Sequence, residues 1–323
     1  MADAGGRRVA LGRLQIVLAG VLWSSSGFFA KAPWFDGWPI EDRGLCLAFW
    51  RSAFAALVLV PLIRRPAWYW QLVPMVACFA LMVWTFMTAM VYGPAANAIW
   101  LQYLAPAWVT VAAVLWMKEP MTRADGRMIV CCLAGVIWIL VMEWVHAPAD
   151  GSGAGQAPAH HPLFATAMGI LSGISFAGVV LCIRSMRSAD PVWLITLNHG
   201  GTALLLLPWV LQAEGTIAPL GYLALGMFGV LQMSLPYVLF ARGLQTTPSP
   251  EASVLTLIEP ILVPLWGFLA WRGHPSYDAP GWWVWVGAGL ILAGLITRYA
   301  PPLIASWRLA RYGPERSETR SVE

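Results

Sequence analysis

The chain has 323 residues, of which 59% are hydrophobic and 11% charged, and its net charge is +4. Its mean hydropathy is +0.66. Because a typical soluble domain has about 25% charged residues, this chain has too few charges to cover the surface of a soluble fold of its length. The composition therefore excludes an ordinary soluble domain and favours an all-α membrane protein with many transmembrane helices.

We predict ten transmembrane helices, each close to the ~20 residues that cross the hydrocarbon core of a bilayer. They cover 14–32, 45–63, 71–91, 95–116, 127–145, 163–183, 191–211, 219–241, 251–271 and 281–299. The first of them has a signal peptide as its alternative, because Arg7, Arg8 and Arg13 precede an apolar run that ends in small residues. We favour the helix, since the run is long for a signal core.

Lys and Arg residues gather in the segments that these ten helices place on the same side as the N-terminus, and few, such as Lys31, Arg43 and Arg272, fall on the other side. The positive-inside rule then predicts a multi-pass protein of the cell (inner or plasma) membrane with both termini cytoplasmic. Segment 1–13 and the basic tail 300–323 are expected in the cytoplasm. The net positive charge is thus a topology signal, and we predict no nucleic-acid partner.

Similar motifs recur in the same order in the two halves of the chain, roughly 150 residues apart. They pair 20–31 with 173–184, 51–61 with 198–208, 93–106 with 247–260, and "WMKEP" with "WRGHP". Because each half contains five helices, the second half enters the membrane from the opposite side. We therefore predict two inverted five-helix repeats, at 14–145 and 163–299, joined by a flexible outer linker at 146–162.

Several motifs together resemble a known family. They are "LWSSSGFFAK" in the first helix, "FWRSAFAALVLVPL" in the second, "WMKEPMTRADG" after the fourth, "SPEASVLTLIEPILVPLWGFL" in the ninth and "GAGLILAG" in the tenth. The chain resembles the ten-helix EamA-type branch of the drug/metabolite transporter superfamily. That resemblance implies a secondary carrier for small metabolites or drugs, frequently an exporter, that works by alternating access. One departure is at 272–274, where the family's second repeat usually has a Gly-Glu pair and this chain has Arg-Gly-His.

Glu259 lies near the centre of the ninth predicted helix, where a carboxylate costs ~2.5–3.5 kcal/mol of insertion free energy. Pro260 and Pro264 follow it, and because proline lacks an N–H, they free the carbonyls of Thr256 and Pro260. We expect a central cavity in which Glu259 couples transport to protons or substrate. The alternative is a Glu259 paired with Arg51 in a helix that is kinked only for packing.

Arg51, inside the second helix, either binds a substrate carboxylate or holds neighbouring helices together. The fourth helix, the repeat partner of the ninth, carries Asn97, Gln102 and Tyr103 before its own helix-breaking Pro106. These side chains supply neutral hydrogen bonding where the ninth helix supplies charge.

Trp23, Trp84 and Tyr237 are further candidates for the wall of the cavity. Each has ordinary helix packing as its alternative.

No metal or cofactor site is predicted. The five cysteines lie in or beside apolar helices without CxxC spacing, and His146, His160 and His161 lie in the linker, where solvated histidines are commoner than metal ligands. The expected partners are a small-molecule substrate, the lipid bilayer and, if Glu259 titrates, protons. The sequence makes no prediction of oligomeric state.

We predict a secondary active transporter that exports small amino-acid-like or amphiphilic metabolites, or drugs, and is not an enzyme. The alternatives are a polytopic membrane enzyme and a non-transporting assembly protein. The sequence contains no HExxH motif, paired-aspartate motif or nucleophile elbow. An assembly protein has no evident use for Glu259.

Overall fold

The structure, a computed structural model, describes residues 2–146, 161–186, 188–274, 277 and 279–312; side chains are described except at 2–7, 249–250 and 301–312. All regular elements in these residues are helical. The first half forms α1 (Ala2–Ser24), α2 (Ser26–Ala30), η1 (Pro33–Phe35), α3 (Ile40–Leu59), η2 (Val60–Leu62), α4 (Leu72–Tyr92), α5 (Ala95–Gln102), α6 (Ala105–Leu115) and α7 (Arg123–Val145). The second half forms α8 (Pro162–Ser185), α9 (Pro191–Val210), α10 (Pro219–Met227), η3 (Phe228–Ser234), α11 (Leu235–Gly243), α12 (Ser249–Leu255), α13 (Ile258–Trp271) and α14 (Trp282–Tyr312).

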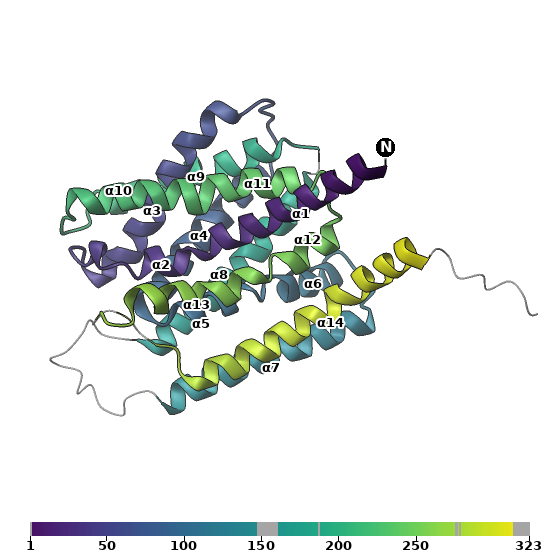
Figure 1. The fold of residues 1–323 in the computed structure, drawn as a ribbon. Coiled ribbons are helices and arrows are strands. Elements are labelled where there is room, and N and C mark those ends of the chain that lie inside the picture. The colour runs from purple at the N-terminus through teal and green to yellow at the C-terminus, as the bar shows by residue number, and fades with distance from the viewer. Residues whose placement is uncertain (1, 147–160, 187, 275–276, 278, 313–323) are drawn as a thin grey trace, which may run out of the picture.

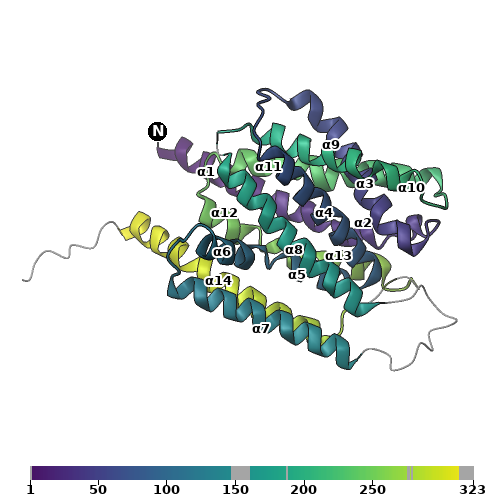
Figure 2. The same cartoon turned by 180° about the vertical axis from the view of Figure 1, so that it is seen from behind.

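Ten membrane-crossing segments follow from these elements. Nine helical segments in the described residues are long and apolar enough to cross a membrane. The tenth is α9, which has 20 residues and packs against α3 and α4, with Asn198 and His199 buried in the bundle. The start of α1 and the end of α14 lie at the same end of the bundle, as an even number of crossings requires (Figures 1 and 2). The predicted all-α fold of ten transmembrane helices is confirmed.

Two predicted helices differ in detail. The first is broken at Ser25, because the hydroxyls of Ser24 and Ser25 donate hydrogen bonds of 2.6 Å to the carbonyls of Val21 and Leu22 and compete with the helical bonds. The last one, predicted to cross the membrane over 281–299, does so over Trp282–Ala300, and α14 continues beyond this span to Tyr312. The two prolines at 301–302 remove two N–H donors but do not end the helix, and no glycine follows them before Tyr312.

Helices of each half pack against helices of the other half. A Cβ added at Gly20 of α1 would lie 2.8 Å from Ile258, at the start of α13. At the repeat-related Gly173 of α8, it would lie 2.6 Å from the carbonyl oxygen of Leu101 in α5. The first helix of each half thus rests on the broken helix of the other half. This reciprocal arrangement is that of two inverted repeats.

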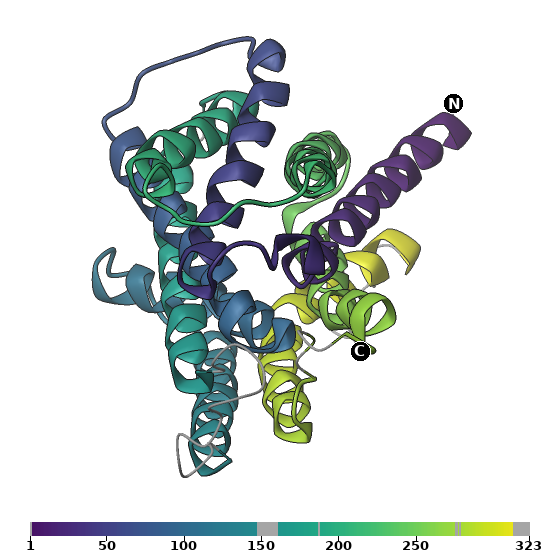
Figure 3. The same ribbon diagram turned by 90° about the vertical axis from the view of Figure 1, so that its left-hand side faces the viewer.

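The pair α7 and α14 forms one edge of the bundle (Figure 3). A Cβ at Gly135 would lie 2.7 Å from the carbonyl oxygen of Gly287, and one at Gly287 would lie 2.9 Å from that of Gly135. Since the two backbones approach this closely, only glycine fits on either side.

Helix α7 begins with a capping box. The Thr122 hydroxyl accepts a hydrogen bond from the Asp125 N–H at 3.1 Å, and the Asp125 carboxylate accepts one from the Thr122 N–H at 2.9 Å. Asp125 also pairs with Arg298 of α14. The cap therefore fixes both the start of α7 and a contact with its partner helix.

Thr122→Ala is expected to lower the free energy of unfolding by about 0.5–2 kcal/mol, because it leaves an N-terminal N–H of α7 without its acceptor. The measurement is the melting temperature of the purified protein in detergent. Thr110→Ala is the matched control, since the Thr110 hydroxyl bonds only to a carbonyl of its own helix. Equal melting temperatures for the two variants would contradict a stabilising cap.

Candidate transport site

The fourth and ninth transmembrane segments are both interrupted just before a proline. The first interruption, at 103–104, separates α5 from α6, and Pro106 follows it. The second, at 256–257, separates α12 from α13, and Pro260 follows it. Because proline cannot donate the backbone bond to the residue four positions earlier, each helix breaks at that point and restarts. Pro264, by contrast, lies inside α13 without ending it.

Tyr103 and Glu259 meet at these interruptions. The Tyr103 hydroxyl lies 2.8 Å from Oε2 of Glu259 and 3.1 Å from the carbonyl oxygen of Thr256. That carbonyl is the one that Pro260 frees, and the Glu259 N–H also donates to it at 3.0 Å. A side chain of the first repeat thus binds both the carboxylate and the freed carbonyl of the second.

The Tyr103 hydroxyl has a single proton for these two acceptors. When Glu259 is ionised, that proton is shared between a carboxylate and a carbonyl, and the charge-assisted bond to Glu259 is the stronger. When Glu259 is protonated, it donates to Tyr103, and the Tyr103 proton is then available for Thr256. Proton binding at Glu259 therefore changes a hydrogen bond between the two repeats.

Tyr103→Phe is expected to reduce the rate of transport about tenfold, because the phenyl ring keeps the packing but leaves Glu259 and the Thr256 carbonyl without their shared donor. The measurement is uptake into proteoliposomes. Tyr92→Phe, at the end of α4, is the control variant. If the two variants transported at equal rates, the hydroxyl of Tyr103 would have no role in transport.

Arg51 lies in the interior without an acidic partner among the side chains that the structure describes. Its residue is 1% exposed, and its Nη1 atom lies 3.4 Å from Oε1 of Gln232. The guanidinium carbon lies 5.3 Å and 5.9 Å from the ring centres of Phe228 and Phe86. In the part of the chain that the structure describes, Arg51 forms no ion pair, and its Nε atom has no hydrogen-bond partner. The predicted alternative, a Glu259–Arg51 pair, is therefore wrong.

Gln232 connects Arg51 to the first helix. It belongs to η3, a seven-residue π-helical segment of a kind that often occurs at functional sites, and its Nε2 atom donates to the Trp23 carbonyl at 3.2 Å. The Trp23 ring lies 5.1 Å from the Tyr237 ring, centre to centre. Trp23, Arg51 and Tyr237, three of the predicted residues, thus belong to one interior cluster.

The other predicted residues lie elsewhere. Gln102 donates to the Ser172 hydroxyl at 2.9 Å, and joins α5 to α8 by a neutral hydrogen bond. Trp84 is 39% exposed, on the face of α4 that also carries the exposed Val73 and Ala77. The structure does not bring Trp84 together with the interior cluster.

Asn97 contacts a carboxylate that the sequence analysis missed. Its Nδ2 atom donates at 2.7 Å to Glu143, a buried residue of α7, and Trp283 of α14 donates to the same oxygen at 3.2 Å. A charge inside the predicted helix 127–145 was the available signal, but the residue lies only two positions from the predicted end, where charges are ordinarily solvated.

No group of three potential metal ligands occurs among the described residues, and His160 lies outside them. His146 and His161 instead contact aromatic rings. The His146 ring stacks on Trp283, and the His161 ring lies 6.2 Å from that of Tyr92.

Comparison with known proteins identifies the family. The profile of the EamA-like transporter family matches the chain twice, at 10–141 and 163–299, once in each half. The chain belongs to this family. Its EamA-like halves are therefore the two inverted repeats that the helix packing shows.

Two relatives of this EamA-like protein are described as transporters. An uncharacterized transporter of Archaeoglobus fulgidus is 27% identical over 292 residues, which cover 88% of this chain and 95% of that protein. The uncharacterized transporter YwfM of Bacillus subtilis is 30% identical over 146 residues, 42% of this chain and 45% of that one. A solved crystal structure shares the fold, with a TM-score of 0.57 and 16% identity over 92% of this chain and 98% of the other. The chain is thus a multi-pass membrane transporter.

Proposed function

We propose that this transporter is a proton-coupled exporter of small amino-acid-like or amphiphilic metabolites, or of drugs, with Glu259 as the coupling group. The contact of Glu259 with Tyr103 and the Thr256 carbonyl carries the proposal. Alternating access in an inverted-repeat carrier moves one repeat against the other around a central site. A proton that changes a hydrogen bond between the repeats biases that movement, and a carboxylate that holds either a proton or a cationic substrate group couples the two flows.

The charge of the interior supports a substrate with an anionic group. Arg51 is buried without a counter-ion among the described residues, and an unpaired cation in a low-dielectric interior is costly. A substrate carboxylate would supply the missing charge. Arg51 and Glu259, a cation and a carboxylate within the same helix bundle, suit an amino-acid-like molecule that carries both charges.

Arg51→Met is expected to leave the melting temperature unchanged or raised, because it removes an unpaired buried charge and keeps an apolar side chain of similar length. Transport of substrates with a carboxylate should fall at least tenfold, a loss of about 1.4 kcal/mol of binding free energy. Both quantities are measured on one purified preparation. If Arg51→Met transported these substrates at the wild-type rate, Arg51 would have a role in packing and none in substrate binding.

The experiment that tests the function uses purified protein in liposomes with a panel of labelled amino acids and amphiphilic drugs. With an acidic interior, proton efflux should drive substrate accumulation, and a collapsed gradient should abolish it. An internal pH dye reports the accompanying proton flux. If every transported substrate accumulated to the same level with and without the pH gradient, proton coupling would be contradicted.

We further propose that both termini are cytoplasmic and that the membrane is the cell membrane. The excess of Lys and Arg on the side of the termini supports this orientation. Fluorescent-protein and alkaline-phosphatase fusions at the C-terminus test it, since the first is active only in the cytoplasm and the second only outside. Phosphatase activity of the C-terminal fusion would contradict a cytoplasmic C-terminus and indicate the opposite orientation.

A further inference from the structure

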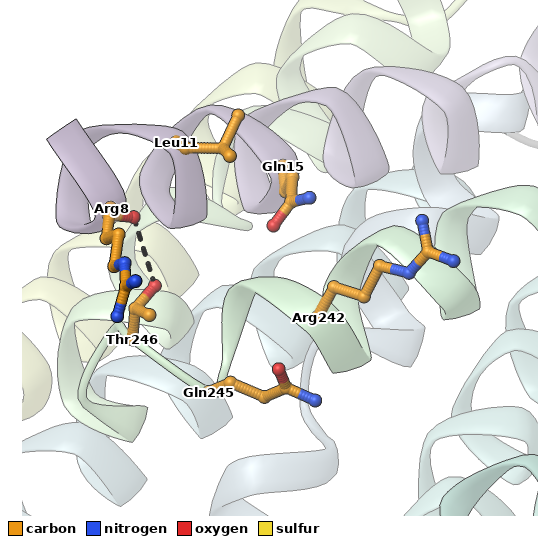
Figure 4. A pocket seen from close by; sticks show the side chains of 6 residues that line it. All are labelled: Arg8, Leu11, Gln15, Arg242, Gln245 and Thr246. Carbon is orange, nitrogen blue, oxygen red and sulfur yellow. Dashed lines mark hydrogen bonds between the residues drawn. The ribbon is translucent and has the colours of Figure 1, made fainter.

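A second polar site lies away from the interior cluster, between α1 and α11. It is a cavity of about 330 Å³. Its walls are formed by six residues, Arg8, Leu11, Gln15, Arg242, Gln245 and Thr246. Figure 4 shows these side chains on α1, on α11 and on the turn after it, with Arg8 beside Thr246 and Arg242 at the other end of the group. The cavity is thus at the end of the bundle where the chain begins. Because α1 crosses the membrane from Arg8 onward, this end lies in the zone of the lipid headgroups.

The cavity is positively charged. Neither the Arg8 nor the Arg242 guanidinium has a hydrogen-bond or ion-pair partner in the described residues, and the other lining side chains are neutral. The acidic residue at this end of α12, Glu251, is already paired with Arg13 at 2.5 Å. Two arginines beside the amides of Gln15 and Gln245 provide the donors that bind a phosphate group.

The surface next to the cavity is apolar. Leu11, Leu14 and Leu18 are 56%, 53% and 43% exposed and lie on successive turns of one face of α1. Leu11 belongs to the cavity wall, so the leucine row leads from the two arginines toward the hydrocarbon core. A charged pocket that continues into an apolar row matches the two parts of a phospholipid.

The corresponding interface of the other repeat, the seam between α4 and α8, is filled by side chains. The cavity between α1 and α11 is therefore not a general property of the repeat. By the spacing of the repeats, His161, Phe164 and Tyr92 occupy the places of Arg8, Leu11 and Thr246. The ring centres of Tyr92 and Phe164 are 5.0 Å apart, and those of Tyr92 and His161 are 6.2 Å apart. Three packed rings in one seam thus correspond to arginine, leucine and threonine around a cavity in the other.

From these four observations we infer that the groove between α1 and α11 binds the phosphate headgroup of an acidic phospholipid from the leaflet on the side of the N-terminus. Arg8 and Arg242 bind the phosphate, and the leucine row contacts the first acyl chain. The binding free energy then has an electrostatic part from the two arginines and an apolar part from the leucines.

Native mass spectrometry of the full-length protein, titrated with phosphatidylglycerol and phosphatidylcholine, tests the inference. Wild-type protein should keep phosphatidylglycerol preferentially, and Arg8→Gln with Arg242→Gln should weaken its binding at least about tenfold, at about 1 kcal/mol for each arginine near the membrane surface. Arg123→Gln with Arg127→Gln, two exposed arginines at the start of α7, is the matched control and should bind as wild type.

Thr246→Tyr gives a second test that keeps both charges. It introduces the ring that fills the related seam and should also abolish the preference for phosphatidylglycerol. Equal binding of the two lipids by wild type, or equal losses in the double variant and its control, would overturn the inference. So would displacement of the lipid by millimolar inorganic phosphate, which would make the cavity a site for free phosphate.

Discussion

Glu259→Gln is expected to abolish proton-driven accumulation of substrate. An imposed difference of one pH unit corresponds to about 1.4 kcal/mol, so a one-to-one exchanger can accumulate substrate up to about tenfold. Glutamine keeps an oxygen that accepts from Tyr103, and therefore preserves the local hydrogen bond, but it cannot release a proton. The variant should equilibrate substrate without accumulating it, at a rate that no longer depends on pH. Proteoliposome uptake at several internal pH values measures both properties.

The matched control is Glu119→Gln. Glu119 pairs with Arg184 at 2.6 Å, and its side chain is 40% exposed, so it is a carboxylate at the periphery of the bundle. This control should accumulate substrate as wild type does. Accumulation by Glu259→Gln at the wild-type level would exclude Glu259 as the coupling group, and the proposed mechanism with it.

Gly27→Ala is expected to have the largest effect on stability. A Cβ at Gly27 of α2 would lie 2.0 Å from the carbonyl oxygen of Val263 in α13, and 2.8 Å from its carbonyl carbon. Backbone atoms cannot move aside as a flexible side chain does, so the two helices must separate. Overpacking of this kind costs typically 1–3 kcal/mol, and the rigid neighbour places this site at the upper end. The melting temperature in detergent measures the loss.

Gly289→Ala is the control for the general effect of glycine in a helix. It lies in α14, and no atom lies within 4 Å of the added Cβ. This variant should melt at or slightly above the wild-type temperature, because alanine favours the helix by about 1 kcal/mol. If Gly27→Ala and Gly289→Ala had the same melting temperature, the close crossing of α2 and α13 would be contradicted.

The fold was predictable because its signals are long and repeated. Ten apolar stretches and a two-fold recurrence of motifs are read over many residues, so an error at one position changes little. Local helix ends were less predictable. Hydropathy does not report the break at Ser25, which arises from hydroxyl bonds to the backbone, or the continuation of α14 to Tyr312.

The site was predictable only in part. The cost of a central carboxylate singles out Glu259, and proline chemistry identifies the freed carbonyl of Thr256. The side chain that binds Glu259 and this carbonyl comes from a segment about 150 residues away. Its identity depends on how the two segments pack, which reasoning about single residues does not give. Tyr103 was therefore predicted as a cavity residue without its partners, and Arg51 was considered as a partner of Glu259 although it contacts Gln232.

The cavity at Arg8 shows another limit of reasoning from sequence. Arg8 and Arg242 were counted only as part of the positive charge on the side of the termini. That count gives the orientation, but it treats all arginines alike. Only the packing of α1 against α11 shows that these two arginines line the same cavity, and only comparison with the rings at Tyr92 shows that the cavity is specific to one of the two related interfaces.

The repeat-related contacts of Gly20 and Gly173 make the packing of the two halves isologous. Gly20 and Gly173 each lie against the broken helix of the other half, so the two halves present the same surface to each other. Such self-complementary surfaces join identical subunits in two-fold symmetric dimers. Here they join two halves of one chain that have since diverged. In this respect the molecule corresponds to a two-fold symmetric dimer whose two subunits are joined in one polypeptide. One half could therefore acquire a charge at Glu259 while the other kept Ala105.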